Sequence, residues 1–491
     1  MSGYVLGIDV GTTYTGAAVA RDGRVEVVSL GHHSSVVPTV VFLREDGELL
    51  VGEAADRRAL QQPDRVAREF KRRMGDPTPL MLAGTPFSPE ALTARVLRSV
   101  YDQVVALQGG QPDRLVLSHP ANWGPYKIDL LAHAVRLAGL EAATFVSEPE
   151  AAAWYYASRE RLDPGQVMAV YDLGGGTFDV AVMRRTEDGF EIVGTPEGID
   201  RLGGIDIDEA VFSRLREALA DAAIARLADG SEESMMAAAR LRRECVDAKE
   251  ALSADDEVVI PIMLPDIQDG VRITRRELED SIRPMLLDTI AALRRAVDSA
   301  EITPDDLSVI LVVGGSSRLP IIAEMITEQL GRPVAVDAHP KHACALGAGL
   351  VGDAAWEVEH GRSARPVVVV PPRPSNGDAA GGGTETATFA APVGPPTASV
   401  PGSAGAGDVP GGGDVPGDGV ADPDPVGGRR RRWPVVVAVL AVIALVAGGI
   451  VATSGGGDDA PEALADTTVA APSTEPAVAA TSATTPPETT P

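Results

Sequence analysis

Two segments of the sequence each place an aspartate and a glycine turn directly after an apolar strand. They match position by position: Val5-Leu6-Gly7-Ile8-Asp9-Val10-Gly11-Thr12-Thr13 and Ala169-Val170-Tyr171-Asp172-Leu173-Gly174-Gly175-Gly176-Thr177. Glycine turns allow several backbone N–H groups to point into one concavity, where they can bind phosphate. An aspartate at the end of such a strand can hold Mg²⁺ through its water molecules, which this ion releases reluctantly. The repeat therefore predicts that two equivalent loops bind phosphate and magnesium.

Each loop continues into a second apolar strand, Gly16–Ala20 in the first copy and Asp179–Met183 in the second. Each copy is therefore predicted to be a β-hairpin. A single copy would more often be an ordinary hairpin than a phosphate loop. Two matched copies that face each other across a cleft favour the phosphate interpretation.

A third glycine-rich turn follows a predicted buried strand, Val309–Val313, and reads Gly314-Gly315-Ser316-Ser317-Arg318-Leu319-Pro320. Glycines at this position allow a flat ligand to approach the backbone. The Arg318 guanidinium can stack on the face of a base. The three turns together predict a nucleotide as the ligand.

With these turns, five segments in the same order resemble the nucleotide-binding domain of the heat-shock-70 (DnaK) chaperone family: Gly7–Tyr14, Ser147–Ala153, Asp172–Val180, Leu202–Asp206 and Gly314–Pro320. The resemblance covers residues 1–352. It implies an α/β fold of the actin-like ATPase type, with two similar halves around a nucleotide cleft. It also implies ATP and Mg²⁺ as ligands and slow hydrolysis of ATP.

The resemblance also implies roles for individual residues. The implied catalytic residues are Lys71, Glu148, Asp172 and Thr177. The residues implied to hold the metal ion through water molecules are Asp9, Asp172 and Asp179. The implied ATP-binding residues are Gly11, Thr12, Thr13, Tyr14, Gly174, Gly175, Gly176, Gly203, Gly204, Lys249, Ser253, Gly314, Gly315, Ser316 and Arg318. From the residues alone, Lys71 could instead belong to a solvated basic helix face, and Glu148 could serve a helix N-terminus.

The segment that would contact the adenosine is predicted to be a helix, Met235–Leu252. Its spacing places Leu241, Cys245, Ala248 and Leu252 on one apolar face. Val246 and Glu250 stand where the resembled family usually has an acid and an arginine, and Lys341 replaces an expected acid after Pro340. We therefore expect weaker contacts to the base, by about 1–2 kcal/mol for each lost contact.

The rest of the chain has a different composition. Residues 353–428 are predicted to be a disordered linker, since 26 of the 58 residues from Pro371 to Gly428 are glycine or proline. We interpret the short run Val367–Val370, which prolines surround, as a chance apolar stretch. We therefore expect no peptide-binding domain of the resembled family in the residues that follow the nucleotide-binding segment.

A basic flank and an apolar run, residues 429–453, predict a single transmembrane helix at the cell membrane. Arg429–Arg432 and Trp433 precede the uncharged run Val435–Val451. Because arginines beside a membrane span favour the cytoplasmic side, we expect the N-terminal ATPase domain to lie in the cytoplasm. Residues 454–491, rich in threonine and proline, are then a disordered tail outside the cell. Cys245 and Cys344 are predicted to be reduced core thiols.

These features favour a membrane-tethered ATPase whose cleft opens and closes with nucleotide and so acts on an unidentified protein partner at the membrane. The formal net charge of −27 argues against a nucleic-acid ligand. Three alternatives remain open: an actin-like ATPase that polymerises along the membrane, a small-molecule kinase, and a nucleotide sensor with weak hydrolysis.

Overall fold

The computed structural model describes residues 3–32, 34–228, 230–264, 267–337, 339–361 and 368–370, all within one compact unit, Met1–Pro401. The predicted membrane segment (429–453), the predicted tail (454–491) and the linker from residue 371 onward lie outside the described residues. No helix in the described part of the chain is both long and apolar enough to span a membrane. The membrane anchor therefore stays a prediction.

Two large sheets have the same strand order. In each, a central strand pairs antiparallel with the strand that follows it and parallel with a later strand, which in turn pairs parallel with an edge strand. The first sheet contains β11 (Thr144–Ser147), β10 (Arg114–His119), β1 (Val5–Val10), β2 (Tyr14–Arg21), β3 (Arg24–Val27) and β19 (Val368–Val370), with β4 (Val37–Pro38) on β2. The second contains β18 (Val334–Val336), β17 (Leu307–Val313), β12 (Val167–Leu173), β13 (Phe178–Arg185) and β14 (Phe190–Ile199).

The central strands β1 and β12 are apolar except for the aspartates near their ends, and side chains cover both of their faces. Every residue of β12 is buried, and so is every residue of β17 except Ser308. Strands buried on both faces carry continuous apolar runs instead of an alternating pattern. This burial holds the strand ends, and the turns that follow them, in fixed positions.

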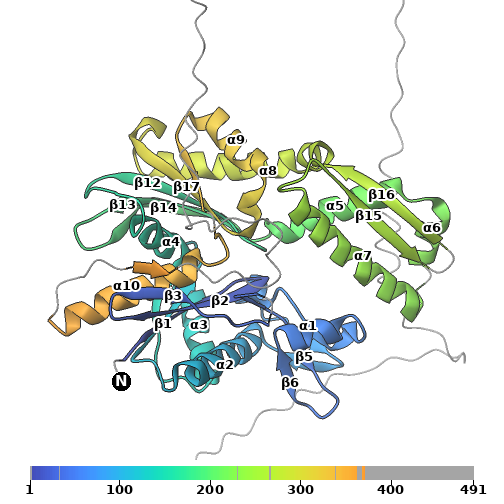
Figure 1. Cartoon of the computed structure of the whole chain (residues 1–491), viewed down its shortest axis with the longest axis horizontal. Coiled ribbons are helices and arrows are strands. Elements are labelled where there is room, and N and C mark those ends of the chain that lie inside the picture. Colours follow the sequence, from blue (N-terminus) through green and yellow to red (C-terminus); the bar gives the residue numbers. More distant parts are fainter. Residues whose placement is uncertain are drawn as a thin grey trace, which may run out of the picture. The chain divides into compact units, whose positions relative to one another are not determined.

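Two helices, α4 (Glu148–Ala157) and α10 (Ala343–Glu359), lie between the two large sheets (Figure 1). They form one buried cluster with residues from both sheets, including Val5 and Met168. A Cβ added at Gly347 of α10 would lie 1.8 Å from the Ala151 carbonyl oxygen of α4. The absence of a side chain at this glycine therefore allows the two helices to cross in close contact.

The outer faces of the sheets are covered by other helices. On the first half these are α2 (Pro89–Gln108) and α3 (Pro125–Leu137), and on the second half α8 (Arg275–Ser299) and α9 (Pro320–Leu330). Each half thus has its own apolar core in addition to the shared one.

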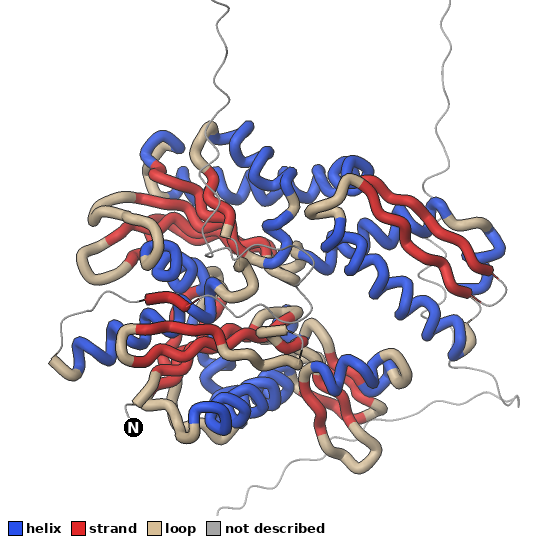
Figure 2. The backbone as a smooth tube through the Cα atoms, viewed as in Figure 1, coloured by secondary structure: helices blue, strands red, loops and turns tan. Residues whose placement is uncertain are grey.

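Each half also carries a smaller unit (Figure 2). In the first half, α1 (Glu53–Ala59) packs on a sheet of β6 (Leu49–Val51), β5 (Val41–Leu43) and β7 (Val66–Ala67). In the second half, the pair β15 (Glu257–Leu264) and β16 (Ile267–Thr274) packs with α5 (Gly204–Ala218), α6 (Asp221–Leu227) and α7 (Glu232–Ala251). The remaining short elements are η1 (Pro63–Arg65), η2 (Phe70–Arg73), β8 (Leu80–Leu82), β9 (Thr85–Phe87), η3 (Pro304–Asp306) and η4 (Gly315–Arg318). This mixed α/β architecture fits the actin-like ATPase fold that the sequence predicts.

The structure agrees with two local expectations and differs from two others. The apolar face of the predicted helix is buried in α7, with Leu241, Cys245 and Ala248 in the core, and both cysteines are free and buried. Gly352, the expected end of the folded domain, lies inside α10, which continues to Glu359 because residues such as Glu357 still pack against the fold. Our interpretation of the valine run as a chance stretch was wrong: Val368–Val370 form β19, a parallel edge strand on β3.

Candidate functional site

A cavity of about 660 Å³ lies where the ends of the central strands of both halves meet. Most of the residues that the sequence analysis selected line it. They are Asp9, Gly11, Thr12, Thr13, Tyr14, Lys71, Glu148, Asp172, Gly174, Gly175, Thr177, Gly204, Lys249, Ser253, Gly314, Gly315, Ser316 and Arg318. Gly176, Gly203 and Asp179 are not among the lining residues, but Gly176 adjoins Thr12, Gly203 adjoins Gly175, and Asp179 pairs with Asp172 across neighbouring strands. The structure therefore brings the selected residues together in one place, while their roles stay predictions.

The two glycine turns have equivalent local structure. In the first hairpin Gly11 N–H donates to the Tyr14 carbonyl at 3.0 Å, and in the second Gly174 N–H donates to the Thr177 carbonyl at 3.0 Å. Among the described residues, none accepts a hydrogen bond from the N–H groups of Gly175, Gly176 or Thr177. Such N–H groups beside a cavity can bind phosphate oxygens.

The two turns also touch each other. A Cβ added at Gly175 would lie 2.0 Å from Thr13 Oγ1, and one at Gly176 would lie 2.3 Å from Thr12 Cγ2. Gly175 and Gly176 must therefore be glycines, because the first loop leaves no room for a side chain at either position. The contact joins the two loops into one continuous wall.

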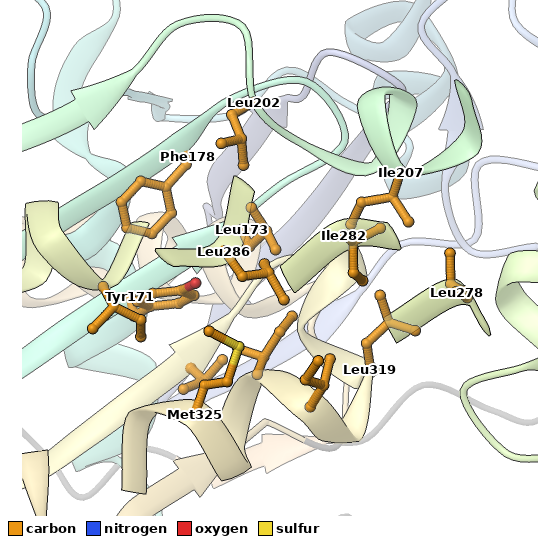
Figure 3. Packing of buried hydrophobic residues seen from close by; sticks show 14 of the residues in the cluster. Tyr171, Leu173, Phe178, Leu202, Ile207, Leu278, Ile282, Leu286, Leu319 and Met325 are labelled. Carbon is orange, nitrogen blue, oxygen red and sulfur yellow. The ribbon is translucent and has the colours of Figure 1, made fainter. Parts of the chain in front are cut away.

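The second turn is held by the core of its own half. Figure 3 shows Leu173 and Phe178, which flank the turn, packed among buried side chains with Tyr171. The Tyr171 and Phe178 rings are 4.6 Å apart, and the Tyr171 hydroxyl lies 2.6 Å from Thr289 Oγ1. The apolar residues on either side of the turn thus fix its ends.

Three aspartates lie beside the loops, with Asp172 and Asp179 buried and Asp9 half-buried, and removal from water raises the pKa of each. The pKa of Asp9 rises to about 6 and that of Asp179 to about 8, first because of burial and next because of the Glu148 carboxylate. The pKa of Asp172 is raised well above its ordinary value for the same two reasons. Burying several carboxylates together is unfavourable unless cations balance them. The cluster is therefore chemically suited to a divalent cation.

Two buried polar atoms at this place have no partner among the described residues: Thr13 Oγ1 and Asp179 Oδ1. The hydrated Mg²⁺ that the sequence analysis predicts could satisfy such atoms through its water molecules. Within the described residues, no group of three or more His, Cys, Asp or Glu side chains is arranged to bind a metal directly. Asp9, Asp172 and Asp179 as ligands through water remain a prediction that these residues fit.

Lys71 forms a buried ion pair with Glu148. Its Nζ lies 2.6 Å from Glu148 Oε1, and both side chains are less than 10% exposed. Burial acts to lower the pKa of Lys71, but the Glu148 and Asp9 carboxylates outweigh it and hold this pKa above its ordinary value. Lys71 is therefore a fixed cation in the cavity, and the solvated-face alternative for this residue does not describe the structure.

Residues of α7, η4 and the segment before α10 also line the cavity. Lys249 Nζ lies 2.7 Å from Asp208 Oδ1 and donates to the Gly204 carbonyl at 3.2 Å. Lys341 Nζ lies 3.3 Å from Glu250 Oε1 and 4.8 Å from the centre of the Tyr14 ring. Of the three residues at which the chain departs from the expected base contacts, Glu250 and Lys341 are thus paired with each other, and Val246 also lines the cavity.

Sequence reasoning missed several polar residues that line or bridge the cavity: Asp56, Arg72, Asp208, Arg243 and Cys344. Arg243 on α7 reaches Asp56 on α1 at 2.7 Å and so connects the two smaller units. Arg72 contacts Gly176 and Asp206 in the second half. No local pattern distinguishes these residues, because each partner lies far away in the sequence.

Comparison with known proteins agrees with these features. The family model described as Hsp70 protein matches residues 5–81 and 78–363. The chain is similar to the chaperone protein DnaK of Thermotoga petrophila, with 31% identity over 355 residues, and to that of Methanothermobacter thermautotrophicus, with 31% identity over 361 residues. Each alignment covers 71% of this chain and 59% of the relative. The chain thus spans somewhat more than half the length of these relatives.

Proposed function

The chain belongs to the Hsp70 family, and from this premise we propose that it is a slow ATP hydrolase. The observation that carries the proposal is that two equivalent glycine turns, a buried Lys71–Glu148 pair and the aspartates Asp9 and Asp172 line one cavity. Members of this family are ATPases of the chaperone type. The nucleotide-binding domain is the part of the family that this chain shares.

In this proposal the N–H groups of the two turns hold the phosphates, and the third turn holds the base end. Lys71 neutralises charge that develops on the transferred phosphoryl group, and Glu148 orients the attacking water and accepts its proton. Bound Mg²⁺ would supply further positive charge, held through water by Asp9, Asp172 and Asp179. Phosphoryl transfer needs mainly positioning and charge stabilisation, which this set can provide.

We further propose that the predicted helix within residues 429–453 tethers the domain to the cell membrane with the ATPase on the cytoplasmic side. Opening and closing of the cleft with nucleotide would then present a changing surface to a protein partner at the membrane. The proposal is supported by the basic flank and apolar run of this segment in the sequence.

The test is binding and turnover of ATP by the full-length chain, solubilised in detergent. Calorimetry with ATP and Mg²⁺ should give saturable binding, and phosphate release should be slow but measurable. Asp172→Asn and Lys71→Ala should abolish release. Absence of ATP binding by the wild-type chain would refute the proposed function. Light scattering after ATP addition distinguishes the polymerising alternative, because filaments scatter strongly.

A further inference from the structure

Successive residues of the short helix η2 reach into different parts of the site. Lys71 extends to Glu148, whereas Arg72 extends to the second half of the molecule. In a 3₁₀ helix, neighbouring side chains project about 120° apart, since one turn contains three residues. The local geometry of η2 therefore directs the side chains of Lys71 and Arg72 to different partners.

Arg72 uses different nitrogens for different partners. Its Nε donates to the Gly176 carbonyl, and one terminal nitrogen lies 2.5 Å from Asp206 Oδ2. The other terminal nitrogen lies 3.6 Å from Glu69 Oε2 on its own segment. The side chain is 11% exposed. A planar guanidinium can make this fork of contacts, whereas a lysine ammonium cannot reproduce it.

The two partners in the second half are themselves connected. Asp206 Oδ2 also accepts the Gly203 N–H at 2.8 Å, at the beginning of α5. Gly204 N–H and Ile205 N–H donate to the carbonyls of Gly174 and Gly175. A Cβ added at Gly203 would lie 2.7 Å from the Gly176 nitrogen. Arg72 therefore holds a unit made of the second glycine turn and the first turn of α5.

The contact between Arg72 and the Gly176 carbonyl also determines the direction in which the Thr177 N–H points. The carbonyl of Gly176 and the N–H of Thr177 belong to one peptide group, in which they point in opposite directions. When the carbonyl faces Arg72, the N–H faces away from Arg72. Thr177 lines the cavity whereas Gly176 does not. The Arg72 contact therefore fixes the direction of the Thr177 N–H, in a residue that lines the cavity.

We propose that Arg72 is a positioning residue that fixes the second glycine turn across the cleft and so sets the rate of ATP hydrolysis. This inference rests on the proposed function. Arg72 touches no reacting atom; it acts through the peptide group before Thr177 and through Asp206. Loss of the Arg72 side chain therefore lowers the rate of hydrolysis, through the position of the second glycine turn, more than it lowers the affinity for nucleotide.

The test compares Arg72→Gln and Arg72→Lys with Arg73→Gln in the full-length chain. Arg73 is the adjacent residue of η2, but it pairs within its own segment, with Asp76 at 3.1 Å and with the Thr78 carbonyl at 2.7 Å. Both Arg72 variants should lower kcat, by about 10- to 100-fold if the phosphate loop shifts by about 1 Å. KM for ATP should stay within about threefold, and Arg73→Gln should match the wild type.

A double-mutant cycle with Asp206→Asn supplies a second criterion. Because Arg72 and Asp206 act as one unit, the combined variant should lose little more activity than Arg72→Gln alone. Equal kcat for Arg72→Gln and Arg73→Gln would overturn the inference. So would loss of ATP binding in the Arg72 variants, which would make Arg72 a binding residue.

Hydrogen exchange separates this inference from the proposed function. Without nucleotide, the hydrogen-bonded amides of Gly174 and of residues 203–206 should exchange faster in Arg72→Gln than in Arg73→Gln, with other regions unchanged. Unchanged exchange at these amides overturns the role of Arg72, even if the wild type hydrolyses ATP. Failure of the wild type to bind ATP, with the exchange difference present, refutes the proposed function alone.

Discussion

Replacing Lys71 by methionine should destabilise the folded protein in a manner that depends on pH. Lys71 is paired at 2.6 Å with Glu148 and interacts with the half-buried Asp9 carboxylate. Removing one partner from a buried ion pair leaves an uncompensated charge and costs about 3–5 kcal/mol. We therefore expect Lys71→Met to lower the free energy of unfolding by about 3 kcal/mol at pH 8.

At pH 6 the loss should be smaller. The pKa values of Asp9 and Asp179 are already raised to about 6 and about 8 in the fold, and loss of the cation raises them further. The folded variant then binds more protons than the wild type between pH 6 and 8, so its stability falls more steeply as pH rises. Each further pKa unit corresponds to about 1.4 kcal/mol. The loss at pH 6 should thus be smaller by at least about 1 kcal/mol.

The measurement is urea unfolding of the wild type and the variant, without nucleotide, at both pH values. The control is Lys71→Met combined with Glu148→Gln, which removes both charges of the pair and should recover part of the stability. An equal loss at both pH values, or a larger loss at pH 6, would refute the electrostatic reasoning.

Three other predictions concern the nucleotide cavity. Gly175→Ala should abolish ATP binding in calorimetry, because the new Cβ would lie 2.0 Å from Thr13 Oγ1, whereas Gly110→Ala, with no atom within 4 Å, should bind normally. Asp56→Asn should speed ADP release, measured with a fluorescent analogue, by up to about fivefold, because it weakens the ion pair with Arg243 that connects the two smaller units and is worth about 1 kcal/mol. Unchanged release would show that this ion pair does not help to retain the nucleotide. Mg²⁺ with ADP should raise the melting temperature more at pH 8.5 than at pH 6, because the buried aspartates lose their protons as pH rises and then need the cation; a larger shift at pH 6 would contradict this.

The parts of the site that were predictable from the sequence depend on short-range rules. A strand that ends in an aspartate and a glycine turn is visible within nine residues, and its duplication at Asp9 and Asp172 indicated two facing loops. The apolar face of α7 follows from helical periodicity in the same way. Five segments in the order found in the Hsp70 family then indicated the fold class.

Other features could not be predicted, because they depend on which distant segments meet. The same pattern Phe70-Lys71-Arg72-Arg73 permits a solvated face, and only the packing of η2 directs Lys71 to Glu148 and Arg72 to Gly176. The strand Val368–Val370 is equally invisible alone, since its identity comes from pairing with Arg24–Val27. Backbone pairing between remote segments has no local signature.

The sequence by itself determined the two glycine turns, their aspartates and the apolar strands that carry them, because backbone conformation and apolar periodicity are properties of neighbouring residues. The tertiary structure decided the electrostatics of the cavity. Folding brings Asp9, Asp172 and Asp179 together with one lysine, and burial raises the pKa values of all three acids. Folding also places Arg72 and Arg243 where each forms an ion pair between the two halves. Charge interactions depend on distance and solvent exposure, and both are set only when the chain is folded.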